Sequence, residues 1–154
     1  MRLFLACICL LLMACNKNEF KDEEALLQAH FWSITAFSVE PAWTHPQDGR
    51  QITDMLAEAE ACSRDDYFEF QPSGVFVHHR GPERCFNGEP ASSTTSWQLS
   101  RNRDKLWLSI AGTPYYEVEL QQLASGQMTW FVQALPITDS VFRNASLVLQ
   151  KHNP

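Results

Sequence analysis

Apolar and polar residues alternate along most of the chain from residue 67 to its end. Alternation with a period of two is typical of strands that bury one face. One of the breaks, Pro72-Ser73-Gly74, is a tight-turn signal, because Pro fixes φ and Gly tolerates a positive φ. Together with an aromatic and β-branched stretch near the start, the pattern predicts eight strands: 31–39, 67–71, 75–80, 94–101, 105–111, 115–122, 128–135 and 143–151.

The same alternation assigns the two faces of the predicted sheet. Glu117 and Glu119 point to solvent in this pattern, and their neighbours in sequence point inward. The short connections suit neighbouring antiparallel strands, and an open sheet edge invites aggregation, so the strands close into a barrel or fold into a sandwich. The inward residues of two adjacent strands are Leu106, Leu108 and Ile110, followed by Tyr116, Val118 and Leu120.

The spacing changes from two to helical between the first two predicted strands. A loop containing Pro41 and Pro46 comes first, and Ile52, Met55, Leu56 and Ala59 then follow at helical intervals. We therefore predict a short helix over 52–59. Because the strand 128–135 is apolar on both sides, this helix is a candidate cover for part of the outer surface. A short helical turn is also expected over 24–29.

The first fourteen residues are predicted to be a signal peptide. Met1-Arg2 gives a charged start, and a nearly unbroken apolar run of about a dozen residues follows, too short to span a bilayer as a helix. The run ends in Leu12-Met13-Ala14-Cys15, which resembles the lipobox of bacterial lipoproteins. The alternative is an ordinary secretory signal that contains cysteines. The predicted organisation is a signal peptide at 1–14, an acylated Cys and flexible tether at 15–24, and one β-barrel domain at 25–154.

The lipobox resemblance implies lipidation of Cys15 by acyl chains such as palmitate. Two or more chains make anchoring to a membrane stable. Asn16 follows the Cys, which in many Gram-negative lipoproteins goes with sorting to the outer membrane. We therefore expect a lipid-anchored protein of the cell envelope, with the outer membrane as the predicted location.

Once Cys7 and Cys9 leave with the signal peptide and Cys15 is acylated, Cys62 and Cys85 remain as a pair. In an exported protein, an even pair is most simply a disulfide. Metal binding by the two thiols is the alternative, although their wide spacing lacks the compactness of a zinc motif.

Charge and motifs exclude several classes of function. The formal net charge is −6, and no long basic stripe exists, so nucleic-acid binding is not expected. No G-x-S-x-G, P-loop, G-x-G-x-x-G or H-E-x-x-H motif is present. His78 and His79 are adjacent in a predicted strand and so point to opposite faces, which prevents them from chelating one metal. We predict no catalytic residue, no metal and no cofactor; an enzyme would need one of these histidines beside a carboxylate in a cleft.

A wider resemblance joins these pieces. Trp32, the segment Ala61-Cys62 to Phe70, Cys85 and Trp97-Gln98-Leu99, in this order, resemble the lipocalin-like domain of lipoproteins from the Bacteroides group. The resemblance implies an up-and-down barrel, with Trp32 placed across its closed end. Two positions depart from the pattern: His30 stands where lipocalins have Gly before Trp32, and Ser96 precedes Trp97 where members tend to have Gly. The family supplies no catalytic residue.

The resulting hypothesis is a lipid-anchored, lipocalin-like barrel that is a non-enzymatic binding module for a small apolar ligand. The alternative is a structural or interaction lipoprotein with a packed barrel that acts through its surface. The aromatic residues decide between them, because an eight-stranded barrel is just wide enough either to be filled by side chains or to hold one small ligand. The predicted ligand-binding residues are Trp97, Leu108, Tyr116, Val118 and Trp130.

Overall fold

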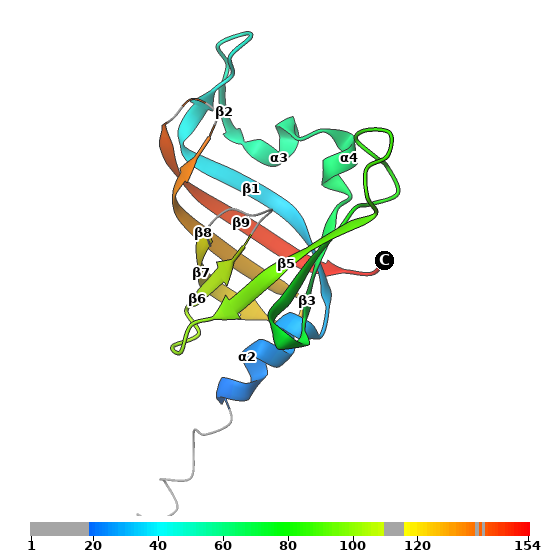
Figure 1. Ribbon diagram of the computed structural model, residues 1–154. Coiled ribbons are helices and arrows are strands. Elements are labelled where there is room, and N and C mark those ends of the chain that lie inside the picture. Colours follow the sequence, from blue (N-terminus) through cyan, green and yellow to red (C-terminus); the bar gives the residue numbers. More distant parts are fainter. Residues whose placement is uncertain (1–18, 110–115, 138, 140) are drawn as a thin grey trace, which may run out of the picture.

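The chain is built mainly of strands, as the computed structural model shows for residues 19–109, 116–137, 139 and 141–154 (Figure 1). The strands are β1 (Phe31–Thr44), β2 (Gln51–Asp54), β3 (Tyr67–Gln71), β4 (Val75–His79), β5 (Ser92–Leu99), β6 (Lys105–Leu108), β7 (Tyr116–Ala124), β8 (Gln127–Pro136) and β9 (Phe142–His152). The helices are α2 (Glu19–Gln28), α3 (Met55–Glu58), α4 (Ala61–Arg64) and the 3-10 turn η1 (Pro72–Gly74). The predicted signal peptide, Cys15 and Ile110 lie outside the described residues.

The strands form one antiparallel sheet that closes on itself. From β3 to β9, each strand pairs with the next strand along the chain, and β1 pairs with β3. β9 also pairs with β1, from Phe31↔His152 to Glu40↔Asn144, which closes the barrel. The remaining strand, β2, pairs with β1 as an outlying hairpin, so eight strands form the wall. The predicted all-β, antiparallel up-and-down barrel of about eight strands is confirmed.

The alternation of side chains explains which residues of the barrel wall face the interior and which face solvent. Leu106, Leu108 and Val118 are buried, and Glu117 between them in register is exposed, as expected. The turn between β3 and β4 lies where the Pro72-Ser73-Gly74 signal predicts it. Gly74 has φ +76, and a Cβ at this position would lie 2.8 Å from the backbone oxygen of Trp97. Glycine is therefore required there by both its conformation and the close approach of β5.

The helix predicted over 52–59 is wrong in its first half. Ile52 belongs to β2, is buried, and pairs with Trp43 at the far end of a β1 that continues through Pro41. The helical spacing of Ile52 and Met55 is coincidental. Asp54 separates the two elements because its Oδ1 accepts hydrogen bonds from the backbone N–H groups of Leu56 and Ala57. It therefore caps α3, which is a single turn.

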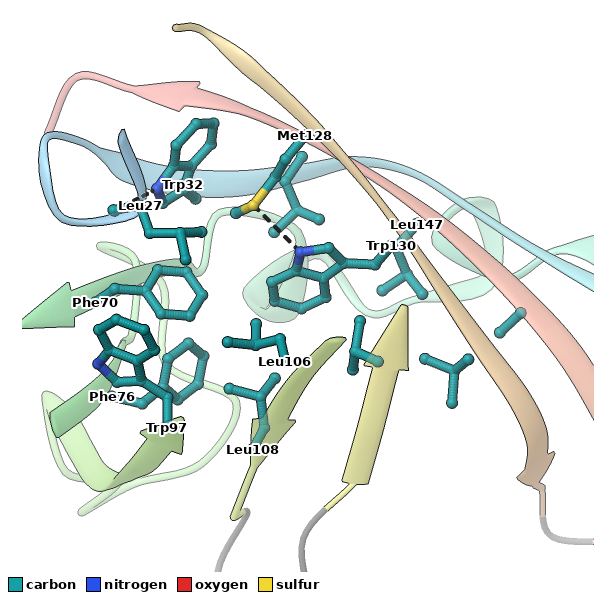
Figure 2. Close-up of a cluster of buried hydrophobic side chains, with 14 of the residues drawn as sticks. Leu27, Trp32, Phe70, Phe76, Trp97, Leu106, Leu108, Met128, Trp130 and Leu147 are labelled. Atoms are coloured by element: carbon teal, nitrogen blue, oxygen red, sulfur yellow. Dashed lines mark hydrogen bonds between the residues drawn. The ribbon is translucent and has the colours of Figure 1, made fainter. Parts of the chain in front are cut away.

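The helix α2 covers one end of the barrel, while α3, within the predicted helix at 52–59, lies against the outside of β1. The helix α2 begins at Glu19, so residues 19–24, predicted as part of a flexible tether, are helical. Leu27 of α2 and Trp32 of β1 are fully buried, and Met128 and Leu149 lie fully buried in the same core cluster. Figure 2 shows Leu27, Trp32 and Met128 close to the aromatic residues of β3, β4 and β5. We call this the closed end of the barrel, and the opposite end the mouth.

The wall has one lateral gap. β1 and β3 pair at Phe31 and Trp32, and β2 does not pair with β1 until Ser38. α3 and α4 lie across the intervening stretch of β1 (Figure 1). At this gap, helices rather than strands close the wall of the barrel.

Candidate functional site

An apolar cavity of about 330 Å³ lies between β1 and β6–β9, toward the mouth of the barrel. We call it the apolar cup. Four predicted ligand-binding residues line it: Leu108, Tyr116, Val118 and Trp130. Four residues that the sequence reasoning did not single out complete the lining: Phe37, Val132, Leu135 and Leu147.

Strand register brings these side chains together. Leu108 at the end of β6 is directly opposite Tyr116 at the start of β7. Leu147 of β9 is directly opposite Trp130 of β8 on one side and Phe37 of β1 on the other. Directly opposed residues of antiparallel strands place their side chains on the same face of the sheet. The period-two pattern of β8 and β9 could have identified Val132 and Leu147 in the same way as Leu108 and Val118.

Trp97 does not line the cup. It lies deeper in the barrel, where its ring packs edge-on against that of Phe70, with 5.4 Å between the ring centroids. Its indole nitrogen donates a 3.0 Å hydrogen bond to the carbonyl of Gln71. Phe70 also packs edge-on against Trp130, with 6.2 Å between the ring centroids, so the three rings form a continuous packed layer (Figure 2). This layer fills the interior between the closed end and the cup. Alternation alone places Trp97 inside but does not say how far along the barrel axis it lies.

The lining of the cup contains no charged side chain among the described residues. The indole N–H of Trp130 is directed at the sulfur of Met128, 3.2 Å away (Figure 2). A cavity of this size and lining suits a small uncharged apolar molecule. Its volume lies at the lower end of the range for ligand sites, about 300–1,000 Å³.

An ion pair holds the chain beside the cup as it passes from β8 to β9. Arg143 is 3% exposed, and its guanidinium donates to both carboxylate oxygens of Asp139 at 2.7 and 2.6 Å. A further hydrogen bond joins Arg143 to the carbonyl of Val141 at 2.9 Å. The hydrogen bonds from Arg143 hold the pKa of Asp139 below its usual range. The pair therefore fixes part of the mouth at neutral pH.

The two histidines of β4 lie on opposite sides of the sheet, as the sequence indicated. His78 Nε2 is 2.7 Å from Asp66 Oδ2, and His79 Nε2 is 3.0 Å from Glu69 Oε2. Burial lowers the pKa of His78 from its ordinary value of 6.5, and the hydrogen bond to Asp66 opposes that effect only in part. His78 also lines a cavity with Asp66, so a histidine beside a carboxylate does occur in a cleft.

Cys62 and Cys85 are joined by a disulfide that fastens α4 to the connection between β4 and β5. A carboxylate oxygen of Glu60 lies within 4.8 Å of both sulfur atoms. A disulfide lacks the thiolates that a metal ion requires, so these residues do not form a metal site while they are bonded to each other. Glu117 is an outward residue that pairs with Lys105 and accepts a hydrogen bond from Trp107, which accounts for its lowered pKa without any catalytic role.

Among the residues that the structure describes, none of the helices has both the length and the apolar character needed to cross a bilayer. No model of a known protein family matches the sequence, and no curated protein does. The solved structures include a similar fold, the complex of bovine odorant binding protein with a selenium-containing odorant. It has 10% sequence identity and a TM-score of 0.45, and the similarity covers 91% of this chain and 79% of that chain. The barrel itself is established by the strand pairing.

Proposed function

We propose that this protein is a non-enzymatic binding module that holds one small, uncharged, apolar molecule in the apolar cup. The observation that carries the proposal is the lining of the cup, which is aliphatic and aromatic and has no charged side chain among its described residues. The depth of the cup is limited by the packed layer beneath it, so the ligand is no larger than one or two fused rings. Transfer of such a ligand from water is favoured by roughly 25 cal/mol for each Å² of apolar surface that becomes buried.

We further propose that the module is lipid-anchored at Cys15, as in lipoproteins of the Bacteroides group. The lipobox in the sequence supports this part of the proposal. The outer membrane is the proposed location, in agreement with Asn16 after the Cys. The anchor and the cup are independent proposals, because they rest on different residues and each has its own test.

Titration with 1-naphthylamine, an uncharged two-ring fluorophore whose emission responds to apolar surroundings, tests the cup. We expect saturable binding that an excess of an unlabelled apolar competitor reverses. Leu135→Glu puts a charge at the rim and should weaken binding at least tenfold, because binding would desolvate the new carboxylate. Leu123→Glu is the matched control, since Leu123 is also a half-buried leucine of the wall but does not line the cup.

A second function is favoured by three exposed apolar side chains, Phe86, Val141 and Phe142, with 61, 43 and 66% of their surface accessible. Contiguous exposed apolar residues, rather than single ones, are typical of contact with another protein, and Val141 and Phe142 are adjacent at the start of β9. If the wild-type protein is folded and binds no apolar probe, the surface-interaction function replaces the carrier function. Substitution of Phe86 and Phe142 by Ser should then abolish the interaction without affecting stability.

A further inference from the structure

A second cavity, separate from the apolar cup, lies at the lateral gap between β1 and β3. It has a volume of about 230 Å³, and α3 and α4 form its outer wall. We call it the lateral cavity. Its apolar lining comes from Ile34, Leu56 and Phe68, and its polar lining includes Ser63, Arg64 and His78. None of these residues lines the cup, so the two cavities have different walls and different chemistry.

The lateral cavity has a route to solvent. A groove on the outer surface, with a volume of about 450 Å³, is lined by Thr35 and Thr53 and also by Leu56 and Arg64. Leu56 and Arg64 line both the groove and the lateral cavity, so these two side chains form a boundary that the cavity shares with the surface groove. Arg64 is itself exposed. A ligand can therefore reach the lateral cavity from the side of the barrel without passing through the mouth.

The charges at the back of the lateral cavity are already paired. Asp66 is 5% exposed and accepts hydrogen bonds from Arg80 at 2.6 Å and from the backbone N–H of Gly81 at 3.2 Å. Arg80 also pairs with Glu89, at 3.1 Å. The Asp66 carboxylate is thus saturated by protein donors and offers little to a cationic ligand.

Arg64 differs from Arg80 because no carboxylate lies within 4 Å of its guanidinium among the described residues. Its Nε donates to the carbonyl of Ala59 at 2.8 Å, and its Nη2 donates to the carbonyl of Ala57 at 3.1 Å. These two bonds hold the guanidinium in place and leave Nη1 without a protein acceptor. A positioned guanidinium with free N–H groups is suited to a carboxylate, and such charge-assisted hydrogen bonds are stronger than neutral ones.

His78 and Ser63 complete the polar side of the lateral cavity. His78 Nε2 lies 2.7 Å from Asp66 Oδ2 and 3.0 Å from Arg80 Nη1, so the ring is held by the paired charges at the back of the cavity. Ser63 offers a hydroxyl group that lies 3.5 Å from Cys85 Sγ. The polar half of the cavity therefore combines the ion pair of Asp66 and Arg80 with Arg64, which has no carboxylate partner among the described residues.

We infer that the lateral cavity binds a small monocarboxylate with a short apolar body. Arg64 receives the carboxylate, and Ile34, Leu56 and Phe68 contact the apolar body. The volume limits the body to a chain of roughly six carbons or one ring, since it is smaller than the usual range for drug-sized ligands. This site is distinct from the cup in its position, its route of entry and the charge of its ligand.

Isothermal titration of the purified full-length protein with hexanoate tests this inference, with hexanol as the uncharged match. We expect hexanoate to bind and hexanol to bind at least tenfold more weakly, because an ionic hydrogen bond is lost. Arg64→Gln should weaken hexanoate binding about tenfold or more, and Arg64→Lys should restore part of it. Arg50→Gln is the matched control, because Arg50 is exposed and pairs with Asp48 and Glu58 on the outlying hairpin.

Chemical-shift mapping with hexanoate locates the site in the wild-type protein, whatever the stability of the variants. The backbone amides of Ile34, Ser63 and His78 should shift, and those of Tyr116 and Val132 in the cup should not. Absence of hexanoate binding at millimolar concentration overturns the inference, as does equal binding of hexanol or equal binding by Arg64→Gln. Shifts confined to the cup also overturn it. The fluorophore titration with Leu135→Glu is independent of all these results, so the two sites can fail separately.

Discussion

The indole nitrogen of Trp32 donates a 2.9 Å hydrogen bond to the backbone carbonyl of Leu27, and both residues are completely buried. Leu27 lies near the end of α2, where a helix leaves carbonyl groups without partners inside the helix. The first strand of the barrel thus satisfies the last turn of the helix that covers it. Trp32 lies at the closed end, as the family resemblance implied, and belongs to the core rather than to a ligand site.

Trp32 is therefore expected to contribute strongly to stability. Trp32→Ala should lower the free energy of unfolding by about 3–5 kcal/mol, and Trp32→Phe by about 1–3 kcal/mol, since Phe keeps an aromatic ring but loses the hydrogen bond. Urea denaturation measures both changes. Trp107→Phe is the control, because Trp107 lies on the outer face and its indole bonds only to exposed Glu117. Equal losses for Trp32→Phe and Trp107→Phe would contradict the role of the closed end.

The disulfide offers a second test. Cys62 and Cys85 are 23 residues apart, and a loop of this length gives a stabilisation of roughly 3 kcal/mol in the chain-entropy model. The double variant Cys62→Ser/Cys85→Ser should lose up to this amount in denaturant titration. Peptide mapping without reductant should recover the two cysteines in one cross-linked peptide. Two free thiols in protein purified without reductant would refute the pairing.

The stability of the barrel should fall on mild acidification because of His78. Burial lowers the pKa of His78 in the folded protein below its ordinary value of 6.5. The unfolded chain therefore takes up a proton at a pH where the folded protein does not, and stability falls as the pH drops below about 6.5. His78→Gln should reduce the slope of stability between about pH 7 and about pH 5, a window above the range in which carboxylates titrate.

The control for His78 is His79→Gln, which also removes one imidazole from β4. Urea midpoints at several pH values provide the measurement for both variants. If His78→Gln keeps the full slope of the wild type, the buried histidine is not the source of the acid sensitivity.

The proposed anchor predicts a specific effect of Cys15→Ser. The variant should no longer incorporate radiolabelled palmitate, and it should escape the cleavage that is specific for lipoproteins. It should also leave the membrane fraction, because no acyl chain remains to hold it. A Cys15→Ser protein that has a normal mature mass and stays with the membranes would show that the lipobox assignment is incorrect.

The sequence was most informative where a strand has one solvent-exposed face and one buried face. Leu106, Leu108 and Val118 alternate with outward residues, so both the strands and their inward faces could be predicted. The segment around Ile52 could not, because a four-residue strand followed by a one-turn helix produces apolar intervals that also fit one continuous helix. Only the pairing of Ile52 with Trp43, a tertiary contact, decides between the two.

In the candidate sites, too, local patterns could be predicted and tertiary contacts could not. Leu108 and Tyr116 could be assigned to the cup because neighbouring inward residues in register must meet. The position of Trp97 along the barrel axis depends on its contact with Phe70, which no local pattern encodes. The lateral cavity depends on the parting of β1 from β3 and on the bonds that hold Arg64 against α3. The bonds of Arg64 are local in sequence, but the cavity beside it depends on strand pairing, so Arg64 could not be distinguished from any other surface arginine in the sequence.

The position of α2 also sets the direction in which the mouth opens. The helix projects from the closed end and begins at Glu19, with three residues between it and Cys15 (Figure 1). Three extended residues reach about 10 Å, and a helix of ten residues adds about 15 Å. With Cys15 in a lipid leaflet, the barrel would stand close to that leaflet with its floor turned toward it and its mouth turned away. An apolar molecule leaving the same leaflet could not slide directly into the cup but would have to travel through water around the barrel wall.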